Sequence, residues 1–348
     1  MAGRKVALIT DTHFGVRKGS QIFHDYFERF YRDTFFPELE RRGIHHCIHL
    51  GDVFDVRKGI DYWSLDWAKR VFFRELSHRG IDTHLIVGNH DIFYKTTLKL
   101  NALQLNLSEF DNLSISIRPE TVNINGTDIF MVPWLCEDNA ADFSERIAQS
   151  DARWCMGHLE LAGFYANQNY QCQHGTNPDV FNQFDRVFSG HFHKKSTRGN
   201  ITYLGNAYQL YWNDEGETRG FHIFDLDTGE IEFVPNPNTM FHKIFYNDTK
   251  QTSLPDTAKL GESFIKIVVE DKSEPAKLAK VVDQLYKVGV HDIKVVEQIS
   301  YDVDDDVEIE GEDTLTTLTN YVLAMDDKVD KAGVIEIFKS LYVEAQEV

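Results

Sequence analysis

Carboxylate, amide and imidazole side chains follow short apolar runs at five places along this sequence. An apolar run of this length that ends in such residues is typical of a buried strand carrying ligands at its C-terminal end. In open α/β sheets, ligands bind in the crevice beyond those strand ends. Five such motifs in chain order therefore predict one shared site. They are Asp11-x-His13, Gly51-Asp52-Val53-Phe54-Asp55, Gly88-Asn89-His90-Asp91, Gly157-His158 and Gly190-His191-x-His193.

The side chains of these motifs suit two divalent metal ions. Two ions about 3.5–4 Å apart need roughly this many ligands, with one carboxylate bridging them, and Asp52 is the natural bridge. Oxygen and imidazole donors without thiolate favour Mn²⁺, Fe²⁺ or Zn²⁺ over Mg²⁺ alone. Such a pair generates hydroxide near neutral pH and binds phosphoryl oxygens. The predicted ligands are Asp11, His13, Asp52, Asn89, His158, His191 and His193.

His90 directly follows a predicted ligand, so its side chain should point toward the substrate. An imidazole there can protonate the leaving oxygen or stabilise charge on the phosphate. The ring needs an acceptor that fixes its orientation and tautomer. Asp55 and Asp91 are both candidates for that acceptor, and we favour Asp55. The predicted catalytic residues are therefore His90 and Asp55.

The first hundred residues alternate between strand and helix patterns, which predicts a parallel, layered α/β domain. After them the sequence becomes richer in strands. An Asn125-Gly126 turn and a second turn at residues 227–229 predict hairpins. The predicted strands are 4–10, 45–50, 82–87, 153–157, 186–189 and 201–204, and the predicted helices are 20–42, 61–79, 96–108 and 139–149.

Pro235 and Pro237 mark a domain boundary, after which strand 264–269, helix 276–289 and strand 293–298 form a compact unit. A strongly acidic run at 302–313 has no Lys or Arg and indicates a solvated linker. The predicted domains are therefore 1–237, 238–301, 302–313 and 314–348. The last carries two amphipathic helices that pack on their own domain or bind a partner. Its apolar stripes include Leu315, Leu318, Val322, Val334, Ile337, Phe338 and Leu341.

The composition limits the possible partners. The net charge of −19 argues against nucleic acid without excluding it, since bound cations offset local negative charge. No apolar run approaches the roughly 20 residues of a membrane span, and the sequence begins in a strand without a signal peptide. The four scattered cysteines fit a reducing compartment. We therefore expect a cytoplasmic protein with no membrane partner. A phosphate-cradling loop is missing as well, so any ATP must bind to another chain.

The five motifs resemble those of the calcineurin-like metallophosphoesterase superfamily, whose pattern runs Asp-x-His, Gly-Asp-x-x-Asp, Gly-Asn-His-Asp/Glu, Gly-His and Gly-His-x-His. Every element is present between residues 11 and 193. The resemblance implies a four-layer αββα fold, with two β-sheets between helices and two metal ions bound by the seven predicted ligands.

Within the superfamily the chain looks like the double-strand-break repair nucleases, a branch that includes SbcD-like bacterial proteins and T-even phage proteins. Gly51–Asp55 lacks the Arg-Gly that follows it in protein phosphatases, and 57–75 gives a charged, aromatic helix. The unit after residue 260 looks like the small α+β capping domain of that branch, and the C-terminal helical pair like its partner-binding segment. The phage type is the most similar in length and in the loop at 205–208.

This resemblance implies a nuclease that degrades duplex DNA as an exonuclease and cuts single strands as an endonuclease. Mn²⁺ is the expected metal, and Mg²⁺ would support lower activity. The implied assembly is a homodimer, joined through 61–79 and 96–108, within a heterotetramer that includes a coiled-coil ATPase of the SbcC type. Some members carry a second catalytic histidine where this chain has Asp55, and that role is not transferred.

Basic residues beside the metal motifs are the candidate phosphate contacts, because backbone contacts there would help most. Two other functions compete with the nuclease. The first is a small-molecule or phosphoprotein phosphoesterase, which would not need the residues after Pro237. The second is a scaffold with a vestigial site, which would not need all seven ligands and His90. The candidate DNA contacts are Arg17, Lys18, Arg57, Lys58, Lys95, Lys99, Lys194, Lys195 and Arg198.

Overall fold

The computed structural model describes residues 4–165, 171–247, 260–271 and 273–297, together with residues 331, 333, 334 and 337. The chain divides into two compact units, Met1–Tyr301 and Asp302–Val348. The helices and strands named below all lie in the first unit.

The first sheet has six strands in the order β12-β11-β1-β2-β3-β4. Strands β1 to β4 are parallel, whereas β11 and β12 are antiparallel to their neighbours. Val6 and Leu8 contribute to one apolar cluster and Ala7 and Ile9 to another, as the two-residue period of a strand requires. The strands are β1 (Lys5–Ile9), β2 (His46–His49), β3 (Asp82–Ile86), β4 (Leu113–Ser116), β11 (Gly220–Asp225) and β12 (Ile231–Pro235).

The second sheet also has six strands, in the order β5-β6-β7-β8-β10-β9. Its hairpin β5–β6 turns at Asn125 and Gly126, whose φ angles of 50° and 78° suit the tight turn that the sequence predicts. Strands β6, β7, β8 and β10 are parallel. The strands are β5 (Glu120–Ile124), β6 (Thr127–Val132), β7 (Trp154–His158), β8 (Arg186–Gly190), β9 (Ser196–Arg198) and β10 (Ile201–Tyr203).

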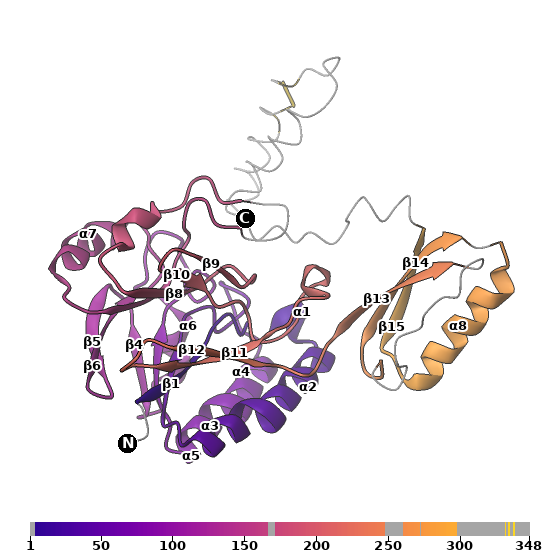
Figure 1. Ribbon diagram of the computed structural model, residues 1–348, viewed down its shortest axis with the longest axis horizontal. Coiled ribbons are helices and arrows are strands. Elements are labelled where there is room, and N and C mark those ends of the chain that lie inside the picture. The colour runs from indigo at the N-terminus through magenta and orange to yellow at the C-terminus, as the bar shows by residue number, and fades with distance from the viewer. Residues whose placement is uncertain are drawn as a thin grey trace. The chain divides into compact units, whose positions relative to one another are not determined.

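Three apolar clusters separate four layers. One lies between the aromatic helices and the first sheet, one between the two sheets, and one between the second sheet and α7. Figure 1 shows α2 to α5 along one face of the first sheet and α7 beside the second. The predicted αββα class is therefore confirmed. The helices are α1 (Val16–Gly19), α2 (Gln21–Phe30), α3 (Phe36–Arg42), α4 (Tyr62–Ala68), α5 (Arg74–His78), α6 (Ala102–Leu107) and α7 (Ala140–Gln149), with short 3₁₀ turns η3 (Pro178–Phe181) and η4 (Trp212–Asp214).

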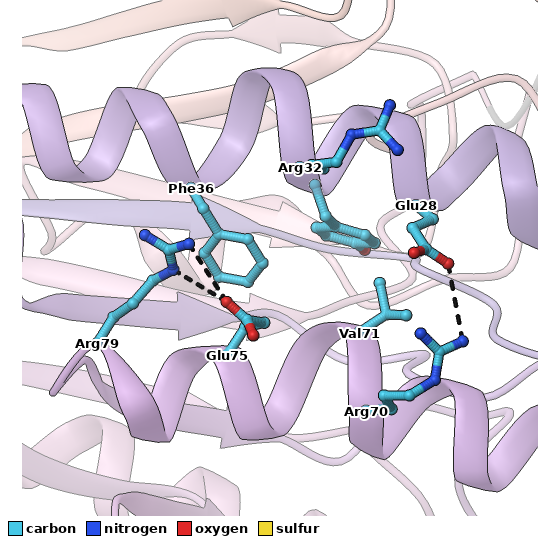
Figure 2. A pocket seen from close by; sticks show the side chains of 8 residues that line it. Glu28, Arg32, Phe36, Arg70, Val71, Glu75 and Arg79 are labelled. Carbon is cyan, nitrogen blue, oxygen red and sulfur yellow. Dashed lines mark hydrogen bonds and ion pairs between the residues drawn. The ribbon is translucent and has the colours of Figure 1, made fainter.

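Each of the two long predicted helices contains a π-helical turn, η1 (Tyr31–Phe35) between α2 and α3 and η2 (Lys69–Phe73) between α4 and α5. Tyr31 and Phe72, one from each turn, have ring centroids 4.9 Å apart. A groove of about 280 Å³ runs along the outside of this helix pair. Figure 2 shows its ion pairs, Arg70 with Glu28 and Arg79 with Glu75.

A third sheet of three parallel strands, β13-β14-β15, follows the two proline residues. Its strands and helix match the predicted β-α-β unit, with one additional strand, β13, before it. The elements are β13 (Phe241–Asn247), β14 (Phe264–Asp271), α8 (Pro275–Val288) and β15 (Asp292–Glu297). The predicted linker 302–313 lies outside the described residues, as do Leu315, Leu318, Val322, Phe338 and Leu341. Val334 and Ile337 are helical.

The predicted helix 96–108 is wrong in its first half. Residues 96–100 form turns and bends, and α6 begins only at Ala102. Asn101 starts the helix because its side-chain oxygen accepts a hydrogen bond from the Gln104 N–H at 2.9 Å. Within the described part of the chain, every helix falls short of the length and apolarity that crossing a bilayer demands.

Candidate metal centre

The five motifs meet at one edge of the two sheets. Strands β1, β2 and β3 of the first sheet and β7 and β8 of the second all end there, because these strands are parallel to their named neighbours within each sheet. Main-chain bonds join the loops: the Asp11 N–H donates to the Gly51 carbonyl at 3.0 Å, and the His13 N–H donates to the Asp52 carbonyl at 3.1 Å. The loops therefore hold the predicted ligands as one unit.

Asp11, His13 and His193 form the first group of donors, with ligand atoms all within 4.8 Å of one another. The Nε2 atoms of His13 and His193 lie 3.1 Å apart. The His193 Nε2 lies 4.0 Å from Asp11 Oδ1. The Asp11 carboxylate also accepts from the Thr10 hydroxyl at 2.7 Å, which holds it in place.

Asp52, Asn89, His158 and His191 form the second group. The Asn89 side-chain oxygen lies 2.9 Å from His158 Nε2 and 3.0 Å from His191 Nδ1. Asp52 Oδ2 lies 3.2 Å from His158 Nε2 and 3.9 Å from His13 Nε2. The Asp52 carboxylate therefore stands between the two groups, where a bridging ligand would stand.

Four of the seven predicted ligands adopt a left-handed backbone. The φ angles are 51° at Asp11, 43° at His13, 53° at Asp52 and 84° at His191. A non-glycine residue rarely adopts this conformation, and a cluster of such residues is typical of functional sites. The surrounding loops therefore hold these side chains in place at a cost in backbone energy.

The glycine residues of the motifs leave space for neighbouring ligands. A Cβ atom on Gly88 would lie 2.1 Å from Asp52 Oδ1, and one on Gly51 would lie 2.5 Å from His158 Nδ1. A Cβ atom on Gly190 would lie 3.0 Å from Asp11 Oδ2. Each glycine is thus needed because another strand end approaches it closely.

The buried charges of the site fit a bound cation. Burial raises the pKa of Asp11 to about 6. Burial by itself would lower the pKa of His158, but the charges of Asp52 and Asp11 and the hydrogen bonds of the ring together outweigh burial and raise that pKa to about 9. Burial lowers the pKa of His191 to about 3, which keeps the ring neutral and able to donate a lone pair. Buried carboxylates and neutral imidazoles at this spacing fit divalent metal ions, which repay the cost of burying the charge.

His90 is oriented through the main chain of Asp55. Its Nδ1 lies 2.5 Å from the Asp55 carbonyl oxygen, which can only accept, so Nδ1 carries a proton. The Asp55 carboxylate lies 3.2 Å from His13 Nδ1. The hydrogen-bond partner of His90 Nδ1 is thus the Asp55 carbonyl, and the Asp55 carboxylate, which we favoured for that role, contacts His13.

Asp91, the other candidate partner, has a different role. Its buried carboxylate accepts from the main-chain N–H groups of Gly88, Asp52, Val53 and Phe54, at 2.9–3.2 Å. It therefore ties the second motif to the third. Burial raises the pKa of Asp91 to about 6.

The candidate DNA contacts differ in their surroundings. Lys18, Lys58 and Lys95 are exposed, and Arg57 is half-buried. Several others already interact with the protein, so fewer cations are available than the sequence suggests. The Arg17 guanidinium lies over the Tyr211 ring, Lys194 pairs with Glu217, Lys195 lies over Phe233, Lys99 pairs with Asp138, and Arg198 lies beside Gly163.

Sequence reasoning missed several side chains that border the site. The Trp134 ring centroid lies 5.0 Å from that of His191. The Tyr211 ring is nearly parallel to that of His193, at 6.4 Å. The buried Arg219 donates to the His193 carbonyl. Each stands alone in the sequence, outside any motif, so no local signal pointed to it.

Comparisons with known proteins agree with the site. A model of the calcineurin-like phosphoesterase family matches residues 4–195. Exonuclease subunit 1 of Enterobacteria phage T4 is 35% identical over 310 residues, which cover 88% of this chain and 89% of that protein. The SbcD subunit of nuclease SbcCD from Staphylococcus saprophyticus is 22% identical over 190 residues, 52% of this chain and 46% of that protein. A solved archaeal phosphodiesterase aligns with 66% of this chain and 99% of its own, at 13% identity and a TM-score of 0.35, which is too low to add to the argument.

Proposed function

The chain belongs to the calcineurin-like phosphoesterase family, and from that premise we propose that it is a metal-dependent nuclease subunit that hydrolyses phosphodiester bonds. The observation that carries this proposal is the convergence of seven donor side chains from five strand ends, with Asp52 between two groups. The similarity to a phage exonuclease subunit over nearly the full length of both proteins supports a nucleic acid substrate.

We propose that Asp11, His13 and His193 hold one divalent ion and that Asn89, His158 and His191 hold the other, with Asp52 shared. Two divalent ions at such a site lower the pKa of a water molecule and stabilise the charge of a phosphoryl transition state. Mn²⁺ suits this mixture of imidazole and carboxylate donors, with Mg²⁺ as a weaker substitute. The left-handed loops and the motif glycines keep the donors in place before any ion binds.

His90 is the proposed proton donor to the leaving oxygen. Because the Asp55 carbonyl fixes a proton on Nδ1, the ring exchanges its second proton at Nε2. Its main-chain N–H donates to Asp52 Oδ1 at 2.8 Å, so the bridging carboxylate also fixes the backbone of His90. Asp55 and Asp91 then act as positioning residues, the first through its carbonyl and the second through the loop it ties together.

DNA is the proposed substrate, with exonuclease action on duplexes and endonuclease action on single strands. The exposed Lys18, Lys58 and Lys95 and the half-buried Arg57 are the strongest candidate phosphate contacts, since each flanks a metal motif. Arg17, Lys194 and Lys195 would contribute once they leave or share their present partners.

We further propose an assembly and a location for this protein. The names of both nuclease relatives describe subunits, which supports a partner chain. We propose a coiled-coil ATPase bound by residues 314–348, and a homodimer within a heterotetramer. The exposed Tyr62, Trp63 and Leu105 of α4 and α6 are available for the dimer contact. The capping role of residues 238–301 and a cytoplasmic location belong to the same proposal.

The test is hydrolysis by the purified chain with Mn²⁺, on linear DNA and on bis-p-nitrophenyl phosphate in parallel. We expect DNA degradation that is lost in Asp52→Ala and kept in Asp33→Ala, an exposed carboxylate paired with Arg32. Turnover of the small ester without action on DNA, even with the ATPase partner added, would favour a small-molecule phosphoesterase. Loss of DNA degradation in both variants would contradict the assignment of Asp52.

A further inference from the structure

A chain of polar contacts starts at the predicted metal ligand His193 and runs through Arg219, Asp214 and Gln209, and we call it the relay. The guanidinium of Arg219, which precedes β11, donates to the main-chain carbonyl of His193 and, at 2.5 Å, to Asp214 Oδ1. Arg219 and Asp214 are 7% and 4% exposed. An ion pair with so little access to water is costly to disturb, because removal of one partner leaves the other charge buried.

The relay continues through Asp214, the last residue of η4. Its second carboxylate oxygen accepts from the main-chain N–H groups of Leu210 and Tyr211, at 2.7 and 3.1 Å. Its main-chain carbonyl accepts from Gln209 Nε2 at 2.9 Å. Asp214 thus fixes residues 209–211, the segment directly before η4.

Gln209 carries the relay into the third sheet. Its side-chain oxygen accepts from the main-chain N–H groups of Met240 and Phe241 at 2.8 and 2.9 Å. Phe241 is the first residue of β13. Gln209 is 2% exposed, so the connection from Asp214 to β13 consists of buried hydrogen bonds.

Trp212 of η4 and the adjacent Glu215 also contact the third sheet directly. The Trp212 ring packs on Phe241 with centroids 4.8 Å apart, and the Lys266 ammonium of β14 lies 4.5 Å from the Trp212 ring centroid. Glu215, just after η4, pairs with Lys243 of β13 at 3.7 Å. A shift of the third sheet therefore reaches η4 by two routes, through Trp212 and through Gln209.

The His193 end of the relay has little room to absorb such a shift. A Cβ atom on Gly205 would lie 2.8 Å from the His193 carbonyl oxygen and 3.1 Å from the Lys195 nitrogen. The Tyr211 ring lies nearly parallel to the His193 ring. Movement of η4 would therefore displace the backbone and the ring of His193 together.

We propose that Arg219, Asp214 and Gln209 are positioning residues through which the seating of β13 sets the position of His193. The three-stranded sheet would thereby control the Asp11, His13 and His193 group of donors. This inference rests on the proposed function only in taking His193 as a metal ligand.

The test compares Gln209→Ala with Asn200→Ala in the full chain. Asn200 is a matched control, because its amide also joins two loops, by donating to the carbonyls of Phe181 and Phe184 at 3.0 and 2.7 Å, but it does not lead to His193. Mn²⁺ binding is measured by calorimetry and bis-p-nitrophenyl phosphate turnover by kcat and KM. We expect Gln209→Ala to bind Mn²⁺ about tenfold more weakly at one site and to lose about tenfold in kcat at unchanged KM.

Asn200→Ala should stay within twofold of the wild type in both measurements, even if its melting temperature falls as far as that of Gln209→Ala. Equal behaviour of the two variants would overturn the inference. If Gln209→Ala does not fold, Gln209→Glu replaces it, since its oxygens still accept from β13 while the donor to Asp214 is lost. A wild-type chain that binds Mn²⁺ but cleaves no DNA would refute the proposed function, and the binding isotherms would still decide the relay.

Discussion

Two regions of this molecule gather charged side chains, and they do so in opposite ways. The metal centre places Asp11, Asp52 and four histidines at the strand ends, with Asp11 and Asp52 0% and 2% exposed. The groove along the outside of the two long helices places arginine and glutamate side chains at the surface (Figure 2), where Arg70 and Glu28 are 54% and 34% exposed.

The difference lies in how the charges are satisfied. In the groove, Arg79 pairs with Glu75 and Glu40 and lies over the Phe36 ring, while Arg32 pairs with Asp33. Exposed pairs of this kind contribute about 0–1 kcal/mol each. In the metal centre the pKa of Asp11 is raised, which shows that the neighbouring groups do not fully offset the cost of burying its negative charge. Charged residues at the surface thus stabilise the contact between two helices, whereas the buried ones form a donor set that fits a divalent cation.

The largest expected effect comes from His90→Ala. Loss of a general acid lowers kcat by about 10²–10⁴-fold. Mn²⁺ binding should stay unchanged, because the imidazole of His90 is not among the proposed ligands. Stopped assays for kcat and calorimetry for Mn²⁺ check both parts. Full activity, or loss of Mn²⁺ binding together with activity, would contradict the role given to His90.

Gly88→Ala should have the next largest effect. The added Cβ would lie 2.1 Å from Asp52 Oδ1 and 2.3 Å from the Asp52 nitrogen, so the proposed bridging carboxylate must move. We expect Mn²⁺ affinity to fall about 100-fold. Gly80→Ala is the control for backbone strain alone, since a Cβ there meets nothing within 4 Å whereas its φ of 62° is strained for alanine. Equal Mn²⁺ affinity in the two variants would show that the close approach at Gly88 is unimportant.

The metal centre illustrates what the sequence alone could predict. The motifs placed Asp11, His13, Asp52, His158 and His191 correctly at one edge, because residues that follow parallel strands must meet there. The layers followed from the alternation of strand and helix patterns.

Other features depended on contacts between distant segments and had no local signal. The sequence left Asp91 as a possible acceptor for the His90 ring. Its actual role could not be predicted, because its four main-chain donors come from two different loops. Arg219 and Gln209 belong to no motif. The predicted helix 96–108 is longer than α6, because apolar residues spaced as in a helix begin at Leu98 whereas the cap formed by Asn101 starts the helix only at Ala102.

A third prediction concerns pH. The pKa of His158 is raised to about 9 by the Asp52 carboxylate, so in the metal-free protein this ring is protonated at pH 7. A raised pKa stabilises the folded state below the unfolded value of about 6.5. That stability is lost as the pH rises toward 9.

In EDTA, the free energy of unfolding should therefore fall between pH 7.5 and 8.5, by roughly 1 kcal/mol per pH unit, since buried rings with a lowered pKa, such as His191, are by then neutral in the unfolded chain as well. With excess Mn²⁺ the slope should reverse, because a metal ligand must be neutral and metal affinity rises with pH. Denaturant titrations across this range check both slopes. The same falling slope with and without Mn²⁺ would show that His158 does not bind the metal.

The smallest effects are expected in the helix groove. Arg70→Ala removes an exposed pair with a 3.8 Å separation and should cost less than about 1 kcal/mol of stability. Arg79→Ala should cost slightly more, because it also removes the contact with the Phe36 ring, worth about 0.5–1 kcal/mol. Neither variant should change Mn²⁺ binding or turnover of the small ester. If Arg70→Ala instead lost DNA cleavage while it kept ester turnover, the groove would be a substrate surface, and the contrast between a structural and a functional set of charges would fail.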